Sequence, residues 1–123
     1  MKLTDNFILE EFHCKDGTKV PAELIGNIIL LANNLQVLRD YIDAPIFINS
    51  AYRTIEYNKS VGGVKNSYHL RGVAADITAK DYAPAGLATI IEELIMTKEM
   101  KQGGIGIYPG FVHYDVRGNR ARW

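Results

Sequence analysis

The sequence predicts an α+β fold in which a small antiparallel sheet is packed with helices. Two segments repeat apolar residues at three- and four-residue steps, which is typical of amphipathic helices. Several short runs are rich in β-branched and aromatic residues and do not alternate regularly with the helices. The chain has 123 residues, so we expect residues 1–123 to form a single domain with a real core.

Composition and charge argue against several classes of protein. Basic and acidic residues balance at 14 each, so nothing favours a nucleic-acid partner. No segment approaches the ~18 consecutive apolar residues of a membrane span, and Cys14 has no second cysteine with which to form a disulfide. Residues 1–7 contain no apolar signal-peptide run. We therefore expect a soluble monomer without a membrane partner, cytoplasmic as made.

The first half of the chain contains the clearest helix. Residues 1–20 read as a short docking segment with a small hairpin, and His13 and Cys14 within it read as a packed or surface pair. Pro21 suits a first helical turn, so a helix is expected over residues 21–41. Its apolar stripe consists of Leu24, Ile28, Leu31, Leu35, Leu38 and Ile42. This helix is scaffold and has no predicted chemistry.

Shorter elements follow this helix. Residues 46–48 read as a buried strand that ends in polar residues 49–53, and Thr54 caps a short helix to about Ser60. A strand of small and β-branched residues covers 74–78, and a second amphipathic helix begins at 81–84 and runs to about 98. Residues 105–108 and 111–116 form a hairpin through the turn dipeptide at 109–110.

Three residues have the chemistry of a catalytic zinc site. His69 and Asp76 lie seven residues apart around a run of small residues, and His113 lies in the last predicted strand. Two imidazoles and one carboxylate leave a fourth tetrahedral position for water. A single histidine is more often structural than a ligand, so residue type alone does not decide between a zinc ligand and a structural histidine.

The order of three motifs resembles the zinc D-Ala-D-Ala carboxypeptidase family of peptidoglycan peptidases, whose core is shared with the hedgehog signalling domain. The motifs are Ser50-Ala51-Tyr52-Arg53, then Ser67-x-His69-x-x-Gly72-x-Ala74-x-Asp76, then His113. The ending, residues 104–115 with Arg122-Trp123, is similar to small bacterial and phage murein peptidases. The resemblance covers about residues 45–123 and implies a hedgehog-like fold.

The resemblance implies a role for each matched residue. His69, Asp76 and His113 match the zinc ligands. Arg53 matches the arginine that holds a substrate carboxylate or the carbonyl near the cut, for which a guanidinium offers two parallel bonds; the alternative is a surface salt bridge. Ser67 matches a residue that lines the substrate cleft, or it caps the turn before the first ligand.

Two further positions remain open at this stage. Tyr52 is a candidate substrate-binding residue or a core residue. Many relatives place an acid three residues before the last histidine as general base, and some a histidine two before, but here these positions are Gly110 and Phe111. Asp115 is the best substitute: it removes a proton from the attacking water, it orients a ligand histidine through its other ring nitrogen, or it forms a plain structural salt bridge. Tyr108 is a weaker candidate for stabilising the oxyanion.

The function implied is zinc-dependent hydrolysis of short peptides with D-residues, in a stem peptide or cross-link of bacterial peptidoglycan. The protein would be a metallopeptidase, either a carboxypeptidase or an endopeptidase, and would act at the cell wall in the manner of a phage endolysin or after delivery by another route. The alternative is a non-catalytic zinc-bearing module that binds the cell wall or belongs to a phage particle.

Overall fold

Five short strands form the sheet of this protein, and the computed structural model describes all residues from 1 to 123. The strands, in their order across the sheet, are β1 (Ile46–Ser50), β2 (Ala74–Ala79), β4 (Val112–Asp115), β3 (Gly104–Ile107) and β5 (Ala121–Arg122). The predicted α+β class is confirmed. The sheet is mixed rather than wholly antiparallel. Strand β5 follows β4 in the chain but pairs in parallel with the outer edge of β3, while all other pairs are antiparallel.

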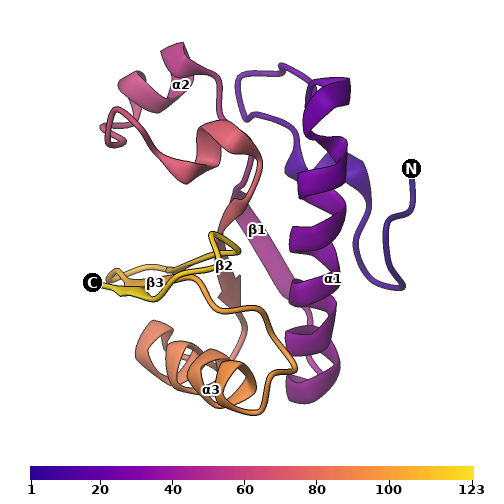
Figure 1. Cartoon of the computed structure of the whole chain (residues 1–123), viewed down its shortest axis with the longest axis vertical. Coiled ribbons are helices and arrows are strands. Elements are labelled where there is room, and N and C mark those ends of the chain that lie inside the picture. Colours follow the sequence, from indigo (N-terminus) through magenta and orange to yellow (C-terminus); the bar gives the residue numbers. More distant parts are fainter.

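The long amphipathic segment forms α1 (Ile25–Ile42), which runs along one side of the molecule in Figure 1. It begins four residues later than predicted, because Pro21 is extended and a 3-10 turn, η2 (Ala22–Leu24), precedes the helix. The buried face is Ile28, Leu31, Ala32, Leu35, Leu38 and Ile42. Apart from Leu24, which is half-buried, the predicted stripe therefore lies in the core.

The second amphipathic helix is α3 (Pro84–Met96), with the proline in its first turn as predicted. It ends two residues earlier than expected, and Lys98 adopts a left-handed conformation (φ 66°) just beyond. Residues from α1, α3 and the sheet share one hydrophobic core of 25 buried residues. On β2 and β4 the core residues alternate with polar ones, so the opposite face of these strands carries Asp76, His113 and Asp115.

Two short helical elements lie on that opposite side. The predicted cap of α2 (Ile55–Ser60) is confirmed, since Thr54 Oγ1 accepts the Tyr57 N–H at 3.1 Å. The segment before β2 forms a 3-10 helix, η3 (Tyr68–Arg71), that ends at Gly72 (φ 69°). In Figure 1 these two elements lie above β3 and the C-terminal strand, with α1 to their right.

The predicted hairpin is also present. Strands β3 and β4 pair antiparallel, and the Tyr108 N–H donates to the Phe111 carbonyl at 3.0 Å to close the connection. Strand β3 begins and ends one residue earlier than predicted, and β4 is one residue shorter than predicted at each end. Strand β5 was not predicted, because two residues are too few to show a pattern.

The N-terminal segment folds back on itself and docks against the core. An antiparallel bridge joins Lys2 to Ile8, and a 3-10 helix, η1 (Leu9–Phe12), follows it. Within this segment His13 Nδ1 accepts the Val20 N–H at 3.0 Å, and Cys14 is buried. Of the packed and surface positions expected for this pair, the packed one is therefore observed.

No helix combines the length and the apolar character that crossing a lipid bilayer requires.

Candidate metal centre

The pairing of β2 with β4 brings two of the predicted ligands together. Asp76 on β2 lies directly opposite His113 on β4, while His69 approaches from η3. All three side chains are buried, with exposed fractions of 3% for His69, 4% for Asp76 and 6% for His113. Three residues that are widely spaced in the sequence thus form one cluster.

Their distances fit a single metal ion. The Oδ1 atom of Asp76 is 3.2 Å from His69 Nε2 and 3.2 Å from His113 Nδ1. One ligand atom from each residue lies within 4.8 Å of the other two. Ligands held at ~2.0–2.2 Å from a tetrahedral zinc ion are about 3.4 Å apart. The cluster therefore needs only a small adjustment to share an ion.

The hydrogen bonds of the two histidines determine which ring nitrogen of each is unprotonated and turns its electron pair toward the cluster. His69 Nδ1 is 2.7 Å from the carbonyl oxygen of Ala51, which can only accept, so Nδ1 carries the proton. His113 Nε2 is 2.7 Å from Asp115 Oδ2 and carries the proton for the same reason. The inner nitrogens then turn electron pairs toward the Asp76 carboxylate. Three electron-rich atoms that converge in this way require a cation between them.

The ionisation of the cluster agrees with this requirement. Burial raises the pKa of Asp76, but hydrogen bonds and charge from His113 and His69 outweigh it and hold that pKa well below its usual range. Burial likewise lowers the pKa of His113, yet the Asp115 and Asp76 carboxylates raise it above its ordinary value of 6.5. Without metal, His113 therefore holds a proton more tightly than a free imidazole does, because its raised pKa favours the protonated ring.

Arg53 belongs to the same cluster and is not a surface residue. One terminal nitrogen donates to Asp76 Oδ2 at 2.9 Å, Nε donates to Ser50 Oγ at 3.0 Å, and the other terminal nitrogen donates to Asn58 Oδ1 at 3.1 Å. Three of its five N–H groups are thereby used and two remain. The predictions did not include Asn58, although it is buried and its amide also holds the Val64 carbonyl.

A cavity of about 480 Å³ opens in front of the cluster. Its lining is the three predicted ligands, Arg53, the loop residues Val61, Gly62, Gly63, Val64, Asn66 and Ser67, and the aromatic residues Tyr68, Tyr108, Phe111 and Trp123. The metal-binding atoms therefore face an open space of the size that a short peptide needs. The only carboxylate in the lining is Asp76.

Asp115 lies outside this cavity and is fully buried. Its Oδ2 accepts from His113 Nε2 on the side of the ring away from Asp76. The remaining capacity of the carboxylate is taken by the Gly104 N–H and by Arg117 through its backbone N–H, Nε and one terminal nitrogen. Of the three predicted roles, this geometry favours the orientation of His113 and a structural ion pair with Arg117 over proton removal in the cavity.

The other two predicted residues differ in position. Ser67 lines the cavity and also caps η3, because its Oγ accepts the His69 N–H at 3.1 Å. Tyr52 packs against the hydrophobic core and does not line the cavity. The structure thus places Ser67 both in the cavity lining and at the turn before His69, and places Tyr52 with the core.

The aromatic side of the cavity had no predicted role in the site beyond Tyr108. The ring of Trp123 lies 4.9 Å from the ring of His113, and its Nε1–H donates to Tyr108 Oη at 2.7 Å. Tyr108 in turn stacks on Phe111 with ring centres 4.5 Å apart. Only the parallel pairing of β5 brings Trp123 to this place, and a two-residue strand gives no sequence signal.

The model of the Peptidase M15 family matches residues 2–115, most of the chain and all three clustered residues. The chain belongs to the M15 peptidase family. Among its curated relatives is the zinc D-Ala-D-Ala carboxypeptidase of Streptomyces albus G, which is 33% identical over 110 residues. That alignment covers 87% of this M15 peptidase and 42% of the relative, so the chain spans less than half of the relative's length.

Family membership and geometry agree on the cofactor. The two imidazoles and one carboxylate of the cluster are ligands that zinc prefers, and three protein ligands leave a coordination position toward the cavity. Zinc is the cofactor of this member of the M15 family.

Proposed function

We propose that the protein hydrolyses a peptide bond in short D-residue-containing peptides of bacterial peptidoglycan, acting at the cell wall as a monomer. One observation carries the proposal: the electron pairs of His69 and His113 and the Asp76 carboxylate converge at the base of a cavity beside Arg53. The similarity to a zinc D-Ala-D-Ala carboxypeptidase supports this class of substrate.

Each residue at the base of the cavity has a distinct task. Bound zinc supplies a Lewis acid that polarises a carbonyl and lowers the pKa of water. The backbone carbonyl of Ala51 and the Asp115 carboxylate hold the two imidazoles in the tautomers that zinc needs. Arg53 keeps two N–H groups for the substrate, and its position beside Asp76 places them next to the metal ligands.

The charge of the lining favours a substrate with a carboxylate. Apart from the metal ligands, Arg53 is the only charged residue of the cavity, and there is no acidic residue to hold a substrate amine. A guanidinium with two free N–H groups binds a carboxylate or a polarised carbonyl. Both a carboxypeptidase and an endopeptidase acting near a peptide terminus fit this arrangement.

Cleavage of muropeptides tests the proposal. Purified protein loaded with zinc is incubated with muropeptides, and mass spectrometry detects new peptide termini. We expect cleavage by the parent protein and by His13→Ala, which changes the one histidine outside the cluster, and none by folded His69→Ala. No new termini from protein with verified zinc content would refute the enzymatic proposal.

A non-catalytic wall-binding module is the second candidate. The observation in its favour is that the cavity contains no carboxylate other than the ligand Asp76 to accept a proton. A cell-wall pull-down distinguishes the two candidates. Retention on insoluble peptidoglycan that needs Arg53 but releases no peptide would support the binding module.

A further inference from the structure

Arg117 forms a two-point ion pair with the carboxylate that holds a metal ligand. Its Nε lies 2.9 Å from Asp115 Oδ1, and one terminal nitrogen lies 2.8 Å from Oδ2. The same Oδ2 accepts the proton of His113 Nε2 at 2.7 Å. Because the Arg117 side chain is only 15% exposed, this pair is shielded from water and holds the carboxylate in one orientation.

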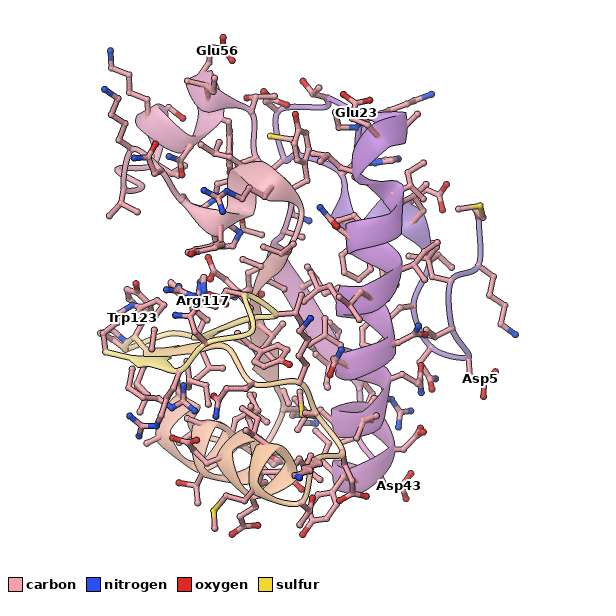
Figure 2. The ribbon with its side chains drawn as sticks, in the orientation of Figure 1. Asp5, Glu23, Asp43, Glu56, Arg117 and Trp123 are labelled. Carbon is pink, nitrogen blue, oxygen red and sulfur yellow. The ribbon has the colours of Figure 1, made fainter.

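The guanidinium also touches the aromatic residues on both sides of the cavity. It lies 4.0 Å over the ring of Tyr68, the residue before the ligand His69, and 5.4 Å from the ring of Trp123. Trp123 packs against the ligand His113. Arg117 therefore joins the η3 side of the cavity to the β4–β5 side, and Figure 2 shows it beside Trp123 at the C-terminal strands.

Two glycines of β3 provide the space for this arrangement. A Cβ atom at Gly104 would lie 2.3 Å from Asp115 Oδ2 and 2.8 Å from a terminal nitrogen of Arg117. A Cβ atom at Gly106 would lie 2.4 Å from Nε1 of Trp123. Neither glycine has a positive φ, so the requirement is for room rather than for backbone conformation.

We propose that Arg117 is a positioning residue with two tasks, to orient His113 for zinc through Asp115 and to fix Trp123 and Tyr68 as the two walls of the cavity. It contacts neither the metal-binding atoms nor the cavity, so it acts through these neighbours. The proposal depends on zinc as cofactor and not on the substrate or on cleavage. Its failure is therefore distinguishable from failure of the proposed function.

Two readouts, neither of them activity, test the two tasks. Zinc affinity is measured by competition with a chromophoric chelator. The fluorescence of the metal-free protein reports on Trp123 alone, because the chain has a single tryptophan. The variants are Arg117→Ala and Arg117→Lys. The matched control is Arg71→Ala, since Arg71 stacks on Tyr68 at 4.9 Å and is exposed.

We expect Arg117→Ala to bind zinc about tenfold more weakly, at the low end of the loss caused by removing a ligand's hydrogen-bond partner. Its emission should move to longer wavelength because the indole loses a packing partner. Lysine keeps the charge beside Asp115 but cannot make two parallel bonds or lie flat on an aromatic ring. Arg117→Lys should therefore regain part of the zinc affinity, while its emission stays shifted to longer wavelength. Arg71→Ala should match the parent in both zinc affinity and emission wavelength.

Each outcome decides one part of the proposal. Zinc affinity within about twofold of the parent in folded Arg117→Ala overturns the orientation of His113, because disturbing the carboxylate that holds a metal ligand should cost about tenfold. An unchanged emission wavelength in Arg117→Ala overturns the proposal that Arg117 fixes Trp123. Losses of the same size in Arg71→Ala overturn both, since any exposed arginine would then have the same effect. If Arg117→Ala does not fold, Arg117→Lys is judged by the same criteria.

Discussion

Asp115 controls the orientation of His113, a proposed zinc ligand, without facing the cavity. Its carboxylate is fully buried and receives five hydrogen bonds, one from His113 and four from Gly104 and Arg117. Burial would raise the pKa of Asp115, but the bonds from His113 and Arg117 outweigh it and hold that pKa well below its usual range. The residue is therefore a permanent anion that keeps the proton of His113 on Nε2.

The variant Asp115→Asn separates this role from general-base catalysis. An amide has the same shape but half the acceptor capacity, so the tautomer of His113 is less firmly fixed. We expect zinc affinity to fall by about 10- to 100-fold, and cleavage at saturating zinc to recover most of the lost rate. The measurements are chelator competition and kcat against zinc concentration. Parent zinc affinity combined with a kcat that saturating zinc does not restore would identify Asp115 as the base instead.

The sequence was sufficient to predict the ligands but not their hydrogen-bond partners. His69, Asp76 and His113 were predicted from residue type, spacing and a family resemblance, and they form one cluster. The partner of His69 is a backbone carbonyl, that of Ala51, which no side-chain pattern can reveal. Strand alternation predicts only that His113 and Asp115 share a face. It does not predict the rotation of the His113 side chain, which decides which ring nitrogen meets Asp115.

At the scale of elements, strand β3 is shaped by what packs on it. Gly104 leaves room for the ion pair of Asp115 with Arg117, and Gly106 leaves room for the indole of Trp123. Glycine weakens a strand because it has no side chain to pack and loses more conformational entropy on folding. Here that cost is offset by the contacts of the side chains that the two glycines admit.

The variant Gly106→Ala tests the importance of this space for the cavity. The added methyl group would overlap Trp123, so the indole must move away from His113 and the cavity loses one wall. We expect KM for a muropeptide to rise several-fold, while zinc affinity stays within about twofold because all three ligands remain. The control is Gly110→Ala, where a Cβ atom meets nothing within 4 Å. Equal KM values for both variants would contradict a role of the Trp123 wall in substrate binding.

The elements that could be predicted are those with strong local signals. The apolar stripe of α1, the Thr54 cap of α2, the proline at the start of α3 and the turn between β3 and β4 all depend on residues close in sequence. Strand β5 has no such signal, because its two residues show no pattern and the strand forms only by pairing with the distant β3. The mixed character of the sheet follows from β5, and so it could not be predicted either.

At the scale of the whole molecule, the site joins parts of the fold that are distant in sequence. His69 comes from a 3-10 helix, while Asp76 and His113 come from strands whose pairing depends on the whole core. A cation that holds all three binds the folded chain and not the unfolded one. Zinc should therefore stabilise the entire protein, because binding energy that needs the native arrangement adds to the free energy of unfolding.

Removal of zinc should lower Tm, and by more at higher pH. Zinc at about 100 times its Kd contributes about 2.7 kcal/mol, a shift of roughly 10 °C for a domain of this size. In the metal-free protein the folded pKa of His113 lies above its ordinary 6.5, so its proton stabilises the fold below that pH, and this contribution is lost as pH rises through the folded pKa. Zinc binding has the opposite dependence, since it needs the unprotonated imidazole.

The two dependences add in the difference between the Tm values of the zinc-bound and metal-free protein. We expect this difference to widen steadily between about pH 5.5 and about pH 8, because protons compete with zinc at the lower end. Scanning calorimetry with zinc and with chelator at each pH measures it. The variant His69→Ala is the control and should show almost no difference at any pH. A difference that stays constant across this range would mean that the metal binds elsewhere, since only a site built on imidazoles couples zinc to a proton in this window.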